Sequence, residues 1–135
     1  MADAKDYGSR EDLAKYRIEV AKEDLNSAKL LLEAKSFRGA NNRAYYAIFH
    51  AINAVHSLNG VSYKKHKDAL SNFNKEYVKT EIFPRSIGRR IAEAEEIRHA
   101  SYYDDFYIAT EEEASEQIDL AEEFIRMVEE FIQGN

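Results

Sequence analysis

The stretch Arg43-Ala-Tyr-Tyr-Ala-Ile-Phe-His-Ala-Ile-Asn-Ala-Val-His-Ser-Leu58 carries apolar side chains on most sides of one helix. When successive residues are turned by about 100°, these side chains separate into two apolar faces. The first face is made of Ala44, Ile48, Ala51, Val55 and Leu58, and the second of Tyr45, Phe49 and Ile52. A helix that is apolar nearly all round is buried on more than one side. Since a bundle of 135 residues rarely encloses one helix so fully, the pattern predicts that a second copy covers the second face, which makes the protein a homodimer.

A polar stripe separates the two apolar faces, and it consists of Arg43, Tyr46, His50, Asn53 and Ser57. Arg43 and His50 lie two turns apart on this stripe. A guanidinium can grip a phosphate with two hydrogen bonds, and an imidazole can move protons near neutral pH. The pair could therefore act on a phosphodiester. The alternative is structural: His50 is a hydrogen-bonded interior histidine, and Arg43 is an ion-pair partner at the helix end.

More helices are expected around this one. Pro84 is the only proline, glycines number five, and residues that favour helix are abundant. Apolar residues at alternating spacings of three and four predict helices at about 10–35, 36–59, 65–80, from Pro84 to about 99, and from Thr110 onward, with a loop over 100–109. The predicted fold is all-α: an antiparallel up-and-down bundle of four or five helices. It forms a single domain, 1–135, with 1–9 as a flexible N-terminal extension.

Charge is distributed unevenly along the chain, whose net charge is -6. Residues 36–98 carry eleven basic and six acidic side chains, whereas residues 99–135 carry one basic and eleven acidic. A basic zone can attract phosphate or RNA. The alternative is a solvated helix face that is balanced by its acidic neighbour.

Several classes of protein are disfavoured by the composition. Cysteine is absent, so disulfides and thiolate chemistry are excluded. His50 and His56 are six residues apart and face different ways, so we predict no metal site and no cofactor. The first ten residues are polar, unlike a signal peptide, and no apolar run approaches the roughly 20 residues that cross a bilayer. These features predict a cytoplasmic protein without a membrane segment.

A second unusual segment is Arg98-His-Ala-Ser-Tyr-Tyr-Asp-Asp-Phe106, where the fourth predicted helix ends. Aromatic and arginine side chains in a loop commonly mark a binding surface, which makes Arg98, Tyr102, Tyr103 and Asp104 candidate ligand-binding residues. The alternative is a tyrosine-rich structural corner in which Arg98 pairs with Asp104 or Asp105.

Several motifs in order resemble the HEPN family, the nucleotide-binding domains of higher eukaryotes and prokaryotes, in its small stand-alone prokaryotic branch. The stretch from Asn42 to Ala51 is close to the family signature RAYYAxFHA. His66 lies in an SxKxH-like region, and the stretch from Phe73 to Pro84 resembles F-x-x-x-x-V-K-T-x-x-x-P. The stretch from Arg98 to Asp105 resembles the corner R-x-x-x-D-Y-D-D. The resemblance covers nearly the whole chain.

The resemblance implies an up-and-down bundle of four or five helices that is commonly a homodimer. Many members are metal-independent RNases with an arginine and a histidine at a dimer cleft, in the motif R-x4–6-H. Other members are inactive and bind nucleotides, RNA or a partner. Stand-alone prokaryotic members are often encoded with a minimal nucleotidyltransferase as a toxin–antitoxin pair.

This sequence departs from the RNase motif. Arg98 matches the motif arginine, but Tyr103 occupies the histidine position and His99 has the wrong spacing; the only literal R-x6-H joins Arg43 to His50. Tyrosine, whose pKa is about 10, is a poor general base at neutral pH. We therefore expect a module that binds nucleotide, RNA or a nucleotidyltransferase partner. The alternatives are an RNase that uses His50 and Arg98, and a purely structural helical adaptor.

The predicted ligand-binding set gathers the polar groups of both segments: Arg43, Tyr46, Asn53, Arg98, Tyr102, Tyr103 and Asp104. The second and fourth helices of an up-and-down bundle are expected to run the same way, so Arg43 and Arg98 should lie at opposite ends. A cluster of His50, Arg98 and Tyr103 is therefore expected more readily than one that includes Arg43 of the same chain.

Overall fold

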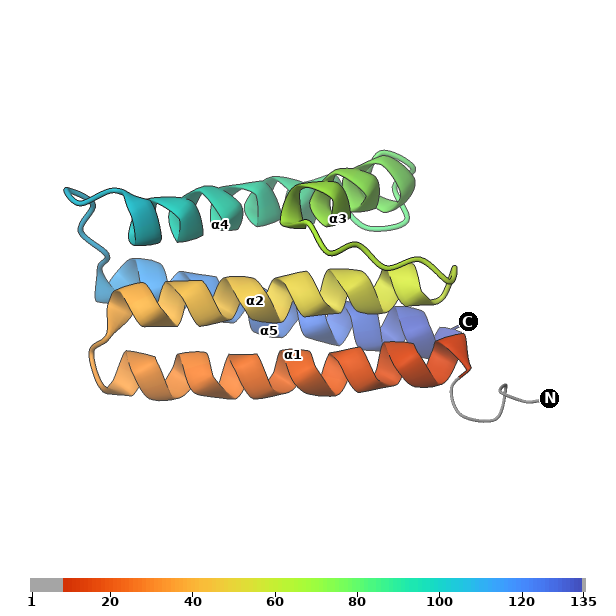
Figure 1. Ribbon diagram of the computed structural model, residues 1–135, viewed down its shortest axis with the longest axis horizontal. Coiled ribbons are helices and arrows are strands. Elements are labelled where there is room, and N and C mark those ends of the chain that lie inside the picture. The colour runs from red at the N-terminus through yellow and green to blue at the C-terminus, as the bar shows by residue number, and fades with distance from the viewer. Residues whose placement is uncertain (1–8, 135) are drawn as a thin grey trace.

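The computed structural model describes residues 9–134, and within this range it contains helices and no strand. In chain order the elements are α1 (Arg10–Glu33), α2 (Phe37–Ser57), α3 (His66–Phe73), a short π-helix η2 (Asn74–Val78), α4 (Arg85–Tyr103) and α5 (Glu111–Gly134) (Figure 1). The all-α helical bundle predicted from the sequence is thus confirmed. The predicted N-terminal extension lies outside the described residues except for Ser9.

Helix ends follow local hydrogen bonding. The hydroxyl of Ser9 accepts a hydrogen bond from the backbone N–H of Asp12 at 2.9 Å and caps α1. The hydroxyl of Thr110, where the last helix was predicted to begin, accepts a hydrogen bond from the N–H of Glu113 at 3.1 Å and caps α5. Gly60, with φ of 74°, lies in the left-handed conformation just beyond α2, where glycine fits without strain.

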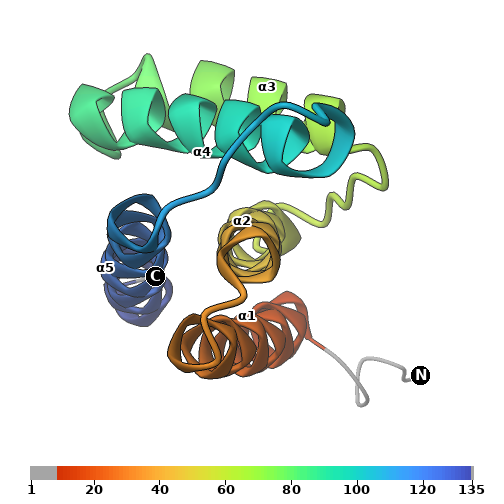
Figure 2. The same cartoon turned by 90° about the vertical axis from the view of Figure 1, so that its left-hand side faces the viewer.

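The helices form two layers. Helices α1, α2 and α5 run side by side in one layer, and α3 and α4 form the second layer, which lies across α2 (Figures 1 and 2). The second apolar face of α2 is buried against this upper layer: Tyr45 is 1% exposed and Ile52 is fully buried. The sequence argument for a homodimer assumed that one chain could not cover this face. That argument is wrong, because α3 and α4 of the same chain cover it.

Helices α2 and α4 run in opposite directions, contrary to the sequence expectation (Figure 1). The chain turns back after α2, α3 runs in the same sense as α2, and α4 then returns. Two hydrogen bonds join the start of α2 to the end of α4: Arg38 Nε donates to the carbonyl of Ser101 at 2.7 Å, and Asn41 Nδ2 donates to the hydroxyl of Ser101 at 3.3 Å. The early part of α2 and the late part of α4 therefore lie at the same end of the molecule.

The fourth helix is also longer than predicted. It continues to Tyr103, so the connection to α5 begins at Asp104 instead of residue 100. Tyr102 and Tyr103 are thus in the last turn of a helix and not in a loop.

A buried aromatic cluster holds η2 and the start of α4 against α5. Phe73 and Tyr77 stack with ring centroids 5.6 Å apart, and Phe83 contacts Phe124 and Phe131 of α5 at 5.8 and 5.4 Å. Such edge and offset contacts between aromatic rings stabilise the fold in addition to the burial of apolar area.

Among residues 9–134, every helix is too short or too polar to cross a bilayer.

Candidate functional site

An ion-pair cluster joins α1 to the polar stripe of α2. Asp24 of α1 is buried, and its Oδ1 accepts a hydrogen bond from Arg43 Nη1 at 2.8 Å. Its other carboxylate oxygen, Oδ2, lies 3.5 Å from His50 Nε2. Arg43 is therefore an ion-pair partner, as the structural alternative predicted, and Asp24 brings Arg43 and His50 together.

His50 is partly buried within this cluster, and burial lowers the pKa of its imidazole. The carboxylate of Asp24 acts in the opposite direction, and the positive charge of Arg17 lowers the pKa further. The net result is a pKa below the usual value of about 6.5. Near neutral pH, His50 is thus a neutral base oriented by a carboxylate, an arrangement that can accept a proton.

His66, at the start of α3, is the central aromatic contact of the site. Its ring stacks on Phe49 with centroids 4.1 Å apart and on Tyr45 at 5.4 Å, and it meets the edge of Tyr46 at 5.3 Å. Burial and the nearby charge of Arg98 lower the pKa of His66. Its Nδ1 is buried and has no partner among the described residues.

Arg98 is held inside the protein. Its guanidinium lies 4.9 Å from the centre of the Tyr45 ring, an attractive arrangement for a cation and an aromatic face. Its Nη2 donates to Glu95 Oε2 at 3.1 Å, and only 12% of the side chain is exposed. The structural alternative paired Arg98 with Asp104 or Asp105, and that pairing is wrong because Glu95 is the partner. Asp104 instead accepts a hydrogen bond from the backbone N–H of Phe106 at 3.0 Å.

These contacts form one continuous band across α1, α2, α3 and α4. Arg98 contacts Tyr45, Tyr45 contacts His66, and His66 contacts Tyr46. The ring of Tyr46 lies 6.4 Å from that of His50, which reaches Asp24 and Arg43. We call this set the polar band: Asp24, Arg43, Tyr45, Tyr46, His50, His66 and Arg98. It contains four of the predicted site residues, namely Arg43, Tyr46, His50 and Arg98.

The other predicted residues lie apart from the polar band. Asn53 is buried, and its Nδ2 donates to the carbonyl of Tyr63 at 3.2 Å, so its contacts are internal. Tyr103 contacts His99 and Tyr102, with ring centroids 4.8 and 5.9 Å away. The predicted cluster of His50, Arg98 and Tyr103 is therefore not formed as expected. His66 lies near Arg98 in the place predicted for Tyr103, and Tyr103 lies in the exposed last turn of α4.

The end of α4 and the following loop expose four large apolar or aromatic side chains. We call this the 102–108 segment; its exposed members are Tyr102, Tyr103, Phe106 and Ile108, and the last two are 93% and 81% exposed. Single exposed apolar residues are ordinary, but here four lie within seven residues of the chain, and exposed apolar area that gathers in one region often marks a contact surface. The carboxylates of Asp104 and Asp105 lie within the same segment.

Sequence reasoning missed three members of the polar band as site residues: Asp24, His66 and Tyr45, the last of which the apolar pattern assigned only to a buried face. Asp24 is one of several acidic residues in α1, and only the fold shows that it is buried beneath the stripe of α2. His66 stands alone at the start of a helix, and only its place in the family-like SxKxH region could have indicated a role in the site.

Within residues 9–134, no three histidine, aspartate or glutamate side chains converge as metal ligands would.

Comparison with known proteins places this arrangement in a family. A model of the HEPN domain matches residues 14–131, which extend from the second turn of α1 into the last turns of α5. The chain belongs to the HEPN family. The HEPN resemblance predicted from the sequence motifs is therefore confirmed.

This HEPN chain is similar to several curated proteins of other organisms. A "UPF0332 protein" of Thermotoga maritima is 33% identical over 92% of this chain and 94% of its own length. Two proteins of Methanocaldococcus jannaschii, each named "Putative toxin", are 38% identical over 80% of both chains and 30% identical over 72% of this chain and 66% of the relative.

Proposed function

We propose that this HEPN protein is a cytoplasmic binding module that works as a homodimer. It engages a nucleotide, RNA or a nucleotidyltransferase partner as one half of a toxin–antitoxin-like pair. The observation that carries the proposal is the exposed 102–108 segment, in which the side chains of Phe106 and Ile108 are almost free of contacts within the chain. The position of Arg98 weighs against RNA cleavage. Its guanidinium is hydrogen-bonded to Glu95, lies over the Tyr45 ring and is almost fully covered, so it is poorly placed to grip the phosphate of a substrate. Binding to a partner is therefore favoured over RNA cleavage.

The 102–108 segment supports the assembly part of the proposal. Phe106 and Ile108 are mostly exposed, and covering such side chains stabilises a complex by roughly 25 cal/mol for each Å² removed from water. Both belong to one loop beside the start of α5, with acidic residues around them that suit the rim of an interface. The names of the two Methanocaldococcus jannaschii relatives, each a "Putative toxin", support a toxin-related role.

The assembly can be tested by light scattering at micromolar concentration. The wild-type protein should have about twice the mass of one chain. A double variant, Phe106→Asp with Ile108→Asp, should be a monomer with an unchanged melting temperature, because both side chains are exposed and make little contact within the chain. The matched control is Leu30→Asp with Ile82→Asp, which alters two other exposed apolar side chains. A monomeric wild type, or the same loss of mass in both double variants, would contradict the proposal.

A metal-independent RNase remains the second candidate, because His50 is a neutral imidazole oriented by a buried carboxylate. An RNase assay in EDTA tests it, with Arg43→Ala and His50→Ala as variants. We expect little or no cleavage by the wild type. Robust cleavage that His50→Ala abolishes would replace the binding proposal with the nuclease.

A further inference from the structure

A basic groove lies outside the polar band, between η2 and the N-terminal half of α4. Its volume is about 650 Å³, and its lining combines three cations, Lys79, Arg85 and Arg89, with the small or apolar residues Val78, Gly88 and Ala92. We call it the η2–α4 groove. It adjoins a smaller apolar hollow of about 90 Å³ that shares Val78, Gly88 and Ala92 and reaches Phe73.

The cations of this groove have little to neutralise them. Within residues 9–134, the structure contains no ion pair of Lys79 or Arg89, and Arg85 approaches only the exposed Glu81, at 3.7 Å. Exposed pairs of this kind contribute little to stability. The segment 64–90 holds eight basic and three acidic side chains, in a chain whose net charge is -6. The excess of positive charge is therefore local, and it is available to an anion.

The backbone of α4 adds to this positive character. No side chain caps the start of α4, and its first turn holds no acidic residue. Unsatisfied N–H groups make a helix N-terminus positive, so arginines placed there raise the free energy of the folded chain unless an anion joins them. Arg85, in the first turn, therefore stands where a purely structural helix would favour Asp or Glu, and Arg89 follows it one turn later.

The wall of the groove is built from two features that cost stability. Residues 74–78 form a π-turn, a rare conformation that is frequently found at functional sites. Gly88 lies within the continuous helix α4, where a glycine costs about 1 kcal/mol of stability relative to alanine. A Cβ at this position would lie only 2.8 Å from Val78 Cγ1, so the glycine lets η2 approach α4 closely. Both features act at the surface that carries the cations.

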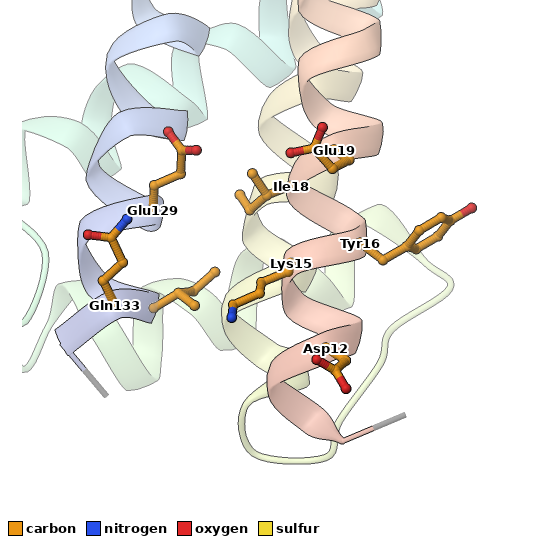
Figure 3. A pocket seen from close by; sticks show the side chains of 8 residues that line it. Asp12, Lys15, Tyr16, Ile18, Glu19, Glu129 and Gln133 are labelled. Carbon is orange, nitrogen blue, oxygen red and sulfur yellow. The ribbon is translucent and has the colours of Figure 1, made fainter. Parts of the chain in front are cut away.

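The hollow at the free ends of α1 and α5 is a useful contrast. Its volume is about 450 Å³, and Lys15 shares it with the carboxylates of Asp12, Glu19 and Glu129. Figure 3 shows these charges interleaved around Ile18, with Lys15 directed toward α5. Because both signs of charge are present there, this hollow has no preference for an anion. The η2–α4 groove differs in having cations alone among its charged lining residues.

We infer that the η2–α4 groove binds consecutive phosphates of an RNA backbone. Arginine forks and free N–H groups at a helix start both suit phosphate oxygens. Lys75 of η2, next to the lining residue Asn74, is also exposed, so the positive surface is larger than one phosphate group requires. No aromatic side chain lines the groove, so base stacking contributes nothing there. Binding is consequently independent of RNA sequence and sensitive to salt.

This inference does not use the 102–108 segment or Arg98, so it can fail or hold separately from the proposed function. The test is fluorescence anisotropy of a labelled 20-nucleotide oligouridine with the full chain. The double variant Lys79→Glu with Arg89→Glu should bind about tenfold or more weakly at about 50 mM salt, since both charges neutralise phosphates. The slope of log K against log salt should also become shallower by about 1.4, because each phosphate that a cation neutralises on a single strand contributes about 0.7.

The matched control is Lys15→Glu with Arg126→Glu, which makes the same change in net charge at two exposed positions on α1 and α5. It should bind within about twofold of wild type, because neither position lies near the RNA. Equal weakening by both double variants would overturn the inference, because net charge alone would then explain it. Glutamine pairs at the same positions repeat the comparison if a charge-reversed variant melts early.

A second arm separates RNA from a free nucleotide, which offers the same phosphate chemistry. Unlabelled oligouridine and ATP compete in parallel against the labelled RNA. Oligouridine should compete far better per phosphate than ATP, because several cations bind along the chain. If ATP competes as well as oligouridine of equal phosphate concentration, the groove is a nucleotide pocket and the RNA inference is wrong.

Discussion

At the residue scale, the least predictable feature is the buried carboxylate of Asp24. The spacing of Arg43 and His50 in the sequence showed that they share a face, and the structure confirms their proximity through Asp24. The helical period places Asp24 only at the edge of the apolar stripe of α1, whereas its exposed neighbour Glu23 faces the opposite side. Whether an edge position is buried depends on how α1 rotates against α2, and that rotation is set by packing across the interface. Sequence therefore predicted the bases of the cluster and missed its acid.

Asp24→Asn should lower the pKa of His50 below its wild-type value. The carboxylate stabilises the protonated imidazole, and an amide removes that charge while leaving burial and Arg17 unchanged. Titration of the histidine ring protons by NMR measures the shift. The control is Glu23→Gln on the same turn, which should leave His50 as it is. Equal shifts in the two variants would mean that Asp24 acts only as a distant charge.

Ile48→Asp should unfold the domain. Ile48 is fully buried on the first apolar face of α2, and an unpaired carboxylate there costs several kcal/mol. That cost approaches the whole free energy of unfolding of a typical domain, roughly 5–15 kcal/mol. Urea denaturation followed by circular dichroism measures it, with the exposed Leu30→Asp as control. A wild-type midpoint for Ile48→Asp would show that the face is misassigned.

At the scale of the elements, helix existence was predictable and helix direction was not. The periodic apolar residues and the Thr110 cap located the helices correctly, whereas the end of α4 and the sense of α4 relative to α2 were wrong. Residues 100–103 carry two tyrosines and precede two aspartates, a composition typical of a loop, yet bonds from Arg38 and Asn41 of α2 to Ser101 hold the last turn. Those tertiary contacts override local preference.

Gly88→Ala should destabilise the domain, although alanine is the better helix former. The new Cβ would meet Val78 Cγ1 at 2.8 Å, and overpacking of this kind typically costs about 1–3 kcal/mol. This exceeds the gain of about 1 kcal/mol in helix propensity. In a Val78→Ala background the same substitution should become stabilising, which a double-mutant cycle of urea unfolding measures. Stabilisation by Gly88→Ala alone would show that η2 can move away from α4.

At the scale of the whole molecule, the two layers explain both a success and an error of the sequence analysis. The two-faced burial of α2 was predicted from its apolar pattern and is confirmed. Its cause was misjudged, since a loop of eight residues after α2 returns α3 over the second face. A loop of this kind has no helical periodicity, so its path could not be predicted from the sequence. The sequence therefore suggested that a second subunit covers the second apolar face of α2, whereas α3 and α4 of the same chain cover it.

Global stability should fall as the pH is lowered from about 7.5 to about 5.5. Burial lowers the pKa of His50, His56 and His66 in the folded protein. The unfolded chain, with histidine pKa values near about 6.5, then binds more protons than the folded one. Stability is thus fully present above this value and declines as pH falls below it. Urea unfolding across this range measures the decline.

His66→Phe should make this pH dependence shallower, because the aromatic stack on Phe49 is kept while one titrating group is removed. The control is His99→Asn, at an exposed position, which should follow the wild-type profile. Unfolding free energies that do not change between these pH values in the wild type would contradict the assignment of all three histidines.

Chain length is adjustable at η2, because a π-turn holds one residue more than an α-turn. The turn closes through the bond from Lys79 N–H to the carbonyl of Asn74 at 2.8 Å. Deleting the exposed Lys75 would let the segment become a regular α-helix with its hydrogen bonds intact. The deletion would leave the residues that follow nearly in register with α3, because the π-turn absorbs its extra residue within a single turn. Relatives that carry a one-residue gap here should therefore have lost the π-turn while keeping the contact of Val78 with Gly88.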